Sequence, residues 1–251
     1  MAIFSYPTPL KDFNLEVAKG NLPGHSVAFV SGRHPSVSVG GTPTTVWNNT
    51  ANTYPWSVWN AGAAVLHLVS SSASDVQTLL LTGLDASYNI ITKLVTLTGT
   101  TAVTTGTTLF FRLNSAIIVT DGTLGAAFGT INIRYGSIAG SIVGRIDPLA
   151  STTSMSIYTV PDGFTAFSTY GDFSVNKNNQ AELAIKWRFF GGPFITVYQA
   201  EVYESFITSM PPIPGAIPAK TDIDNMVQSV DNNGSRVYSN QQLLLIDNRY
   251  L

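Results

Sequence analysis

Residues 78–119 read TLLLTGLDASYNIITKLVTLTGTTAVTTGTTLFFRLNSAIIV, and this stretch decides the fold class of the chain. It consists almost entirely of Thr, Val, Ile, Leu and Phe, which favour the pleated surface of a strand. Turn-forming residues at Gly83, Asp85, Gly99 and Gly106 divide it at strand-length intervals. One lysine, one arginine and one aspartate carry all of its charge. The stretch therefore predicts four short strands and shows no sign of chemistry.

Short strands and turns continue on both sides of this stretch. Residues 63–70 and 130–135 each predict one strand, and the second alternates cleanly between apolar and polar positions. Residues 183–207 predict a long hairpin that turns at Gly191-Gly192-Pro193. The Pro-rich residues 210–219 cannot join a central strand and predict a rigid crossover. Residues 221–230 show no clear pattern.

The fold class follows from many short strands, frequent turns and the lack of long amphipathic helices. The sequence predicts an all-β chain, with a jelly-roll-like antiparallel β-sandwich over residues 25–251. An extended N-terminal arm over residues 1–24 precedes it. Two smaller β-domains that meet near residues 148–154 are the alternative.

Charge is scarce throughout the chain of 251 residues. Charged residues make up 11%, against about 25% in an average domain. The net charge of −2 provides no basic field for nucleic acid, and no apolar run approaches the ~18 residues of a membrane helix. Pro7 and Pro9 interrupt the N-terminus where a secretory signal needs an apolar core. We expect much of the surface to be covered by other subunits; a surface of Ser, Thr, Asn and Gln is the alternative.

The N-terminal arm is apolar but too short to fold alone. Prolines and glycines break it into short pieces, and the central KDFNLEVAK fits two templates. Leu10, Phe13 and Val17 suit a helical stripe, whereas Phe13, Leu15 and Val17 suit an extended strand. We expect the arm to pack on a neighbouring subunit. Its predicted contact residues are Phe4, Tyr6, Leu10, Phe13, Leu15 and Val17.

Three of the four tryptophans, Trp47, Trp56 and Trp59, lie close together in the sequence. Such large rings anchor cores or interfaces. We expect them to pack in a core or in a contact between subunits. The alternative is an aromatic platform for sugars, which requires exposed, coplanar rings.

The sequence contains no signature of catalysis. His25, His34 and His67 lack the spacing of a helical zinc motif, and there is no cysteine to assist them. Serines for a Ser-His-Asp triad are plentiful, but the G-x-S-x-G elbow is missing.

Paired carboxylates are the remaining candidates for chemistry. Asp222 and Asp224 lie two residues apart, and residues 231–234 match part of a calcium loop whose downstream glutamate is missing. We interpret both segments as solvated turns. We therefore expect no catalytic residue, no metal site and no cofactor.

Two stretches carry a family resemblance. Residues 20–56 read GNLPGHSVAFVSGRHPSVSVGGTPTTVWNNTANTYPW, and residues 83–105 read GLDASYNIITKLVTLTGTTAVTT. They resemble the N-terminal and middle regions of virion structural proteins from tailed phages of cyanobacteria and marine bacteria. Lys93 departs from that family, because an acidic residue is expected there. The matching patterns are turns and packing positions, not catalytic signatures.

The resemblance implies a non-enzymatic particle component located in the virion. The first hypothesis is a capsid decoration or head-associated subunit, held by its N-terminal arm and by oligomer contacts. A tail, neck, baseplate or fibre component, with a carbohydrate-binding β-sandwich, is the alternative. The expected partners are copies of the same chain, with a trimer favoured by analogy, and the major capsid protein or tail and neck proteins. Neither nucleic acid nor a membrane is expected as a partner.

Overall fold

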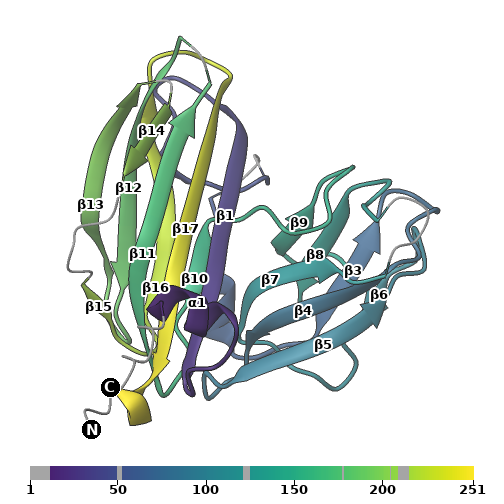
Figure 1. Ribbon diagram of the computed structural model, residues 1–251. Coiled ribbons are helices and arrows are strands. Elements are labelled where there is room, and N and C mark those ends of the chain that lie inside the picture. Colours follow the sequence, from purple (N-terminus) through teal and green to yellow (C-terminus); the bar gives the residue numbers. More distant parts are fainter. Residues whose placement is uncertain (1–11, 50–52, 121–124, 177, 204, 209–214) are drawn as a thin grey trace, which may run out of the picture.

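The computed structural model describes residues 12–49, 53–120, 125–176, 178–203, 205–208 and 215–251, the segment 205–208 by its backbone alone (Figure 1). Strands hold 53% of the residues and helices 7%, so the predicted all-β class is confirmed. Every strand pairing in these ranges is antiparallel. No helix in them is long and apolar enough to cross a membrane.

Two β-lobes stand side by side in Figure 1. The terminal lobe comprises residues 25–47 and 155–251, and the inserted lobe comprises residues 53–153. The chain enters the inserted lobe after β2 (Thr44–Thr45) and returns from it before β10 (Ile157–Thr159).

The terminal lobe contains two sheets. In the β1 sheet, the strand order is β1 (His25–Val37), β17 (Ser235–Asp247), β11 (Phe164–Val175) and β14 (Ser205–Thr208), and β15 (Ala216–Ile217) also pairs with β11. In the β10 sheet, the order is β10, β16 (Asp222–Val230), β12 (Gln180–Arg188) and β13 (Phe194–Tyr203), and β2 also pairs with β16. Both sheets contribute to one buried core, which includes Val30, Leu183, Ile223, Val237 and Leu243.

The inserted lobe also contains two sheets, and it begins with the short helix η1 (Trp56–Ala61). The order in the first sheet is β6 (Val103–Thr104), β3 (Leu66–Ser70), β8 (Ile131–Tyr135) and β9 (Ile142–Ile146). The order in the second is β5 (Ile90–Thr96), β4 (Thr78–Leu84) and β7 (Arg112–Ile118). The predicted four strands of residues 78–119 are β4, β5, β6 and β7. A second core fills this lobe, including Leu66, Leu81, Phe110, Ile131 and Ile133.

This division differs from both domain arrangements that the sequence suggests. The buried residues fall into two separate cores, and not into one core over residues 25–251. The chain does change lobes near residues 148–154, but it also changes lobes near residues 45–56. The second β-unit is therefore an insertion within the first, because the terminal lobe needs β1 as well as β10 to β17 to complete its two sheets.

The N-terminal segment contains the helix α1 (Phe13–Ala18), so these residues are helical and not extended as the predicted arm was, and Leu10 of the predicted stripe lies outside the described residues. Asp12 caps the helix, because its side-chain oxygen accepts a hydrogen bond from the Leu15 amide at 3.0 Å. The helix lies against β1, and the Phe13 ring meets His25 edge to face at 5.7 Å. A second short helix, η2 (Asn248–Tyr250), ends the chain.

Candidate functional site

Buried charge gathers where the inserted lobe covers the β10 sheet, in a cluster that we call the inter-lobe junction. Asp222 and Asp224 begin β16 and lie on one face of it, because side chains of a strand alternate. That face meets the inserted lobe, whereas Ile223 points into the terminal core. Both aspartates are buried, with 3% and 2% of their surface exposed. The interpretation as a solvated turn is therefore wrong, since the segment is an inner strand covered on both faces.

Asp222 connects an arginine from each lobe. Its Oδ1 accepts hydrogen bonds from Arg112 Nε at 2.9 Å and from Thr159 Oγ1 at 2.6 Å. Its Oδ2 accepts from Arg188 Nη2 at 2.6 Å and from Arg112 Nη2 at 3.2 Å. Arg112 begins β7 of the inserted lobe, and Arg188 ends β12 of the terminal lobe. Removal of the carboxylate would leave both guanidinium groups without this partner, which is costly for a desolvated charge.

Asp224 has a different environment from Asp222. Its Oδ2 accepts hydrogen bonds from Trp56 Nε1 at 2.7 Å and from Thr45 Oγ1 at 3.1 Å, both neutral donors. Its Oδ1 is buried without a hydrogen-bond partner. Burial raises the pKa of Asp224 to about 7, and the two hydrogen bonds offset this only in part. The partners of these two carboxylates on one strand face thus differ, because only Asp222 contacts arginine.

Hydrogen bonds to the backbone also connect the lobes. Asn114 of β7 donates its side-chain amide to the Thr159 carbonyl of β10 at 3.1 Å, and its Oδ1 accepts from the Thr159 amide at 3.1 Å. The amide of Asp162 donates to the carbonyl of Tyr88 at 2.9 Å. These contacts join the lobes at two places, Asn114 with Thr159 and Tyr88 with Asp162.

Aromatic rings enclose the arginines of the junction. The guanidinium carbon of Arg112 lies 4.3 Å from the ring centre of Phe111 and 5.8 Å from that of Trp56. The guanidinium carbon of Arg188 lies 5.2 Å from the ring centre of Trp56. Such cation–π contacts are strongest where the cation is desolvated.

The structure places all three predicted tryptophans inside the chain. Trp47 and Trp59 are fully buried and Trp56 is 8% exposed. Trp47 and Trp56 flank Tyr54, whose ring centre lies 5.2 Å and 4.8 Å from theirs. Of the two expected uses, core packing is the one seen; rings buried this deeply offer no surface to another subunit. The sugar platform fails on these rings for the same reason, since it requires exposure.

Burial closes the two carboxylates of the junction off from solvent. A glycosidase or hydrolase carboxylate must reach substrate and water, whereas Asp222 and Asp224 are sealed between two lobes. No group of three or more His, Asp or Glu residues in the described ranges is arranged to hold a metal ion.

The predicted arm residues fall into three groups. Phe13 and Leu15 of α1 are about half exposed, whereas Val17 is buried against the protein's own β1 sheet. Phe4, Tyr6 and Leu10 lie outside the described residues. A groove of about 650 Å³ runs beside α1 between that helix and strands β1, β11 and β17.

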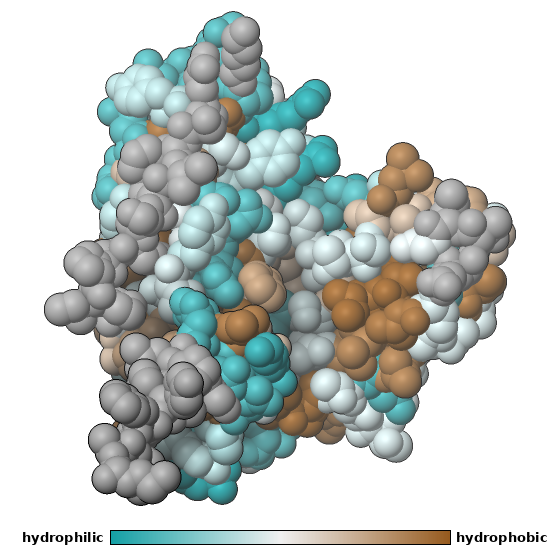
Figure 2. Space-filling model, in the orientation of Figure 1, coloured by the Kyte–Doolittle hydropathy of each residue, from teal (hydrophilic) through white to brown (hydrophobic). Residues whose placement is uncertain are grey.

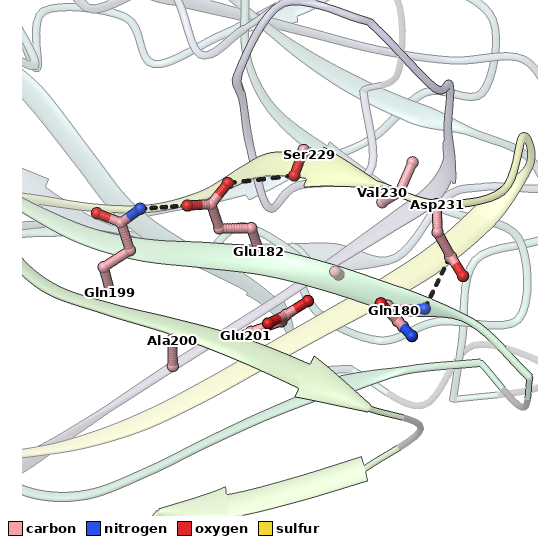
Figure 3. Close-up of a pocket in the computed structure, with 9 residues that line it drawn as sticks. Gln180, Glu182, Gln199, Ala200, Glu201, Ser229, Val230 and Asp231 are labelled. Atoms are coloured by element: carbon pink, nitrogen blue, oxygen red, sulfur yellow. Dashed lines mark hydrogen bonds between the residues drawn. The ribbon is translucent and has the colours of Figure 1, made fainter.

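A second hollow, shown in Figure 3, lies on the β10 sheet. It has a volume of about 410 Å³ and is lined by residues of β12, β13 and the end of β16. Two of its carboxylates have partners within the chain: Glu182 accepts from Gln199 and from Ser229, and Asp231 Oδ1 accepts from the Gln180 amide at 2.8 Å. The hollow is open and polar, and Glu201, which pairs with Glu182 across β12 and β13, also lines it.

Sequence reasoning missed Arg112, Arg188 and Thr159 as partners of Asp222. Arg112 and Asp222 are separated by 110 positions and lie in different lobes, so no local pattern joins them. The local pattern is short: Asp222-Ile223-Asp224 alternates at the two-residue period of a strand, but the polar Asn225 and the apolar Met226 break the alternation.

Comparison with known proteins gives little. No family model and no curated protein matches the chain. Among solved structures, it is similar to that of the infectious bursal disease virus Gt strain, with 12% identity, a TM-score of 0.21, and coverage of 94% of this chain and 78% of that one. For the VP2 subviral particle of the same virus, the values are 14%, 0.21, 91% and 74%. TM-scores this low carry no information on fold or function.

Proposed function

We propose that this chain is a non-enzymatic structural subunit of a virus particle, in the virion of a tailed phage, and more specifically a capsid decoration or head-associated subunit. Strand order in the terminal lobe is the observation that carries the proposal. The family resemblance of residues 20–56 and 83–105 directs it to tailed phages.

The strand order supports a jelly roll with an inserted lobe. A jelly roll places its eight strands, counted along the chain, in the orders 1-8-3-6 and 2-7-4-5, an architecture common in viral capsid proteins. Counted without the short β2 and β15, the terminal lobe has eight strands: β1, β10, β11, β12, β13, β14, β16 and β17. Their observed orders, β1-β17-β11-β14 and β10-β16-β12-β13, follow the same rule.

Scarce charge supports assembly. Charged residues make up 11% of the chain, and several large apolar side chains are exposed on its described surface. An exposed apolar surface with few charges lowers the solubility of the free chain and suits permanent contacts with other subunits. We assign these contacts to copies of the chain, with a trimer as the favoured oligomer, and to the major capsid protein or tail and neck proteins.

Jelly rolls also occur in lectins, so the alternative is a tail component that binds carbohydrate. That function requires an exposed aromatic platform with polar groups beside it. Trp47, Trp56 and Trp59 are buried, and this favours the particle subunit over the lectin.

Removal of residues 1–24 tests the role of the arm. Both cores are made of residues beyond this segment, so the shortened chain should fold with unchanged circular dichroism. We expect it to lose incorporation into particles when it competes with the full chain. A Phe13→Ala, Leu15→Ala variant, which removes only exposed side chains of α1 that are predicted contacts, should also incorporate less well than the full chain. Normal incorporation of the shortened chain would contradict an arm-held subunit.

A further inference from the structure

Most of the outer face of the β5-β4-β7 sheet is an apolar surface that the chain itself leaves open; only its end at Leu84 and Arg112 is buried at the inter-lobe junction. In Figure 2, hydrophobic residues cover the part of the inserted lobe where these strands lie. Leu94 of β5 pairs with Leu80 of β4, which pairs with Ile117 of β7, so three aliphatic side chains form one row across the sheet. Leu94 is 59% exposed and Ile117 is 40% exposed.

Threonine rows lie on both sides of the aliphatic row. Thr96 pairs with Thr78, and their hydroxyl oxygens are 2.8 Å apart. Thr92 pairs with Thr82, which pairs with Ser115. The two hydroxyl groups of the first row therefore hydrogen-bond to each other, and the rows on both sides of the aliphatic row are polar but uncharged.

No charged residue points out from this face. Lys93 is the only charged residue of β5, and it alternates with Thr92 and Leu94, so it belongs to the opposite side of the sheet. Arg112 of β7 turns into the inter-lobe junction. Exposed sheet faces usually carry charged residues that prevent association. The absence of charge here points to a face that is covered by a partner.

We infer that this face packs against the same face of a second copy of the chain, about a two-fold axis. The partner surface must itself be free of charge, because a buried unpaired charge opposite this face would be costly. The face of another copy meets that condition at every position. Flat rows of Leu, Ile and Thr also suit aligned packing of two sheets, in which the facing side chains interdigitate about 10 Å apart.

The size of the face limits the strength of this contact. The open part of the face, about five residues on each of three strands, covers roughly 14 by 17 Å, or about 240 Å², from the ordinary spacings of strands and residues. A stable dimer usually buries about 800 Å² on each partner. The contact is therefore weak between two free chains and becomes significant where many copies are held side by side. The inference rests on the proposed function only where many copies are held side by side in a particle. The weak contact between free chains does not depend on it.

Sedimentation of the purified full chain over a wide range of concentration tests the inference. We expect the average mass of the wild type to rise with concentration and that of Leu94→Lys to stay at its low-concentration value. Ile138→Lys is the matched control, since Ile138 is 57% exposed on the β8–β9 turn of the other sheet in this lobe. This variant should associate like the wild type.

Cross-linking adds a positional test, because the chain has no cysteine. Thr92→Cys should give dimers with a short bifunctional thiol reagent, and the added Leu94→Lys change should abolish them. Association that persists in Leu94→Lys, or a wild type that remains monomeric at the highest concentration, would overturn the inference. If the chain is absent from particles but Leu94→Lys still blocks association, the inference stands and the proposed function falls.

Discussion

The two aspartates of β16 should respond in opposite ways to the same substitution. Asp222→Asn and Asp224→Asn each replace a carboxylate by an amide of equal size, two residues apart on one strand face. Asp222 faces two arginines, whereas Asp224 accepts only from Trp56 and Thr45. Neutralisation therefore removes a matched charge in the first variant and an unmatched one in the second.

The effect of Asp224→Asn depends on pH. Burial raises the pKa of Asp224 from 3.8 to about 7 in the folded chain, so the folded state binds a proton more tightly than the unfolded state. The stability from this proton is fully present below the unfolded value and is lost as the pH rises through about 7. Between about pH 5 and about pH 8, this loss is on the order of 3 kcal/mol. Asparagine does not titrate, so the variant should lack this loss and be more stable relative to the wild type at the higher pH.

Asp222→Asn should destabilise the chain at both pH values. It leaves the buried guanidinium of Arg112 and the partly buried one of Arg188 without their carboxylate. Breaking one partner of a buried ion pair costs about 3–5 kcal/mol. The loss should appear as weaker docking of the lobes as well as lower global stability.

Urea unfolding followed by tryptophan fluorescence measures both variants against the wild type at each pH. His34 also titrates in this range, since burial lowers its pKa to about 4 and its stabilisation is lost as the pH falls below its ordinary value. It is present in all three chains and cancels in the differences. If the difference in unfolding free energy between Asp224→Asn and the wild type is the same at both pH values, Asp224 does not have a raised pKa in the folded chain.

Three further predictions follow from other parts of the molecule. Asn114→Ala should lower the free energy of unfolding by roughly 1–3 kcal/mol, because the Thr159 amide and carbonyl lose their partners. Limited proteolysis should then cut between the lobes sooner, and an unchanged digestion pattern would contradict a role of Asn114 in joining them. Gly32→Ala should lower the melting temperature by more than a typical surface change, since a Cβ there would lie 2.0 Å from the Val46 carbonyl oxygen. The control is Ser31→Ala, because Gly40 has a φ of 67° that alanine adopts poorly. Equal melting temperatures for Gly32→Ala and Ser31→Ala would contradict the prediction. Tryptophan emission should be blue-shifted and resist acrylamide, because Trp47, Trp56 and Trp59 are buried; ready quenching of most of the emission would restore the sugar platform.

The strands were predictable because their signals are local. The alternation of residues 130–135 placed Ile131 and Ile133 inward, and both are fully buried. The turn at residues 161–163 was also predictable, because Pro-Asp-Gly is a common turn sequence. Gly163 takes a φ of 75°, which glycine tolerates.

The junction was not predictable because it depends on contacts between distant residues. A strand that is polar on one face is usually solvated there, so Asp222 and Asp224 indicated a surface. Only the insertion of a second lobe covers that face, and the polar residues 48–52 through which the chain enters this lobe resemble the many other turns of the sequence. The buried pairing of Arg112 with Asp222 follows from that topology alone.

Peptide counting on gradient-purified particles, separated into heads and tails, tests whether this chain is a head subunit. We expect many copies of this chain in the head fraction, at a fixed ratio to the major capsid protein. A few copies in the tail fraction would move the chain to the neck, baseplate or fibre and would reopen carbohydrate binding. Absence from both fractions would contradict a structural role in the virion.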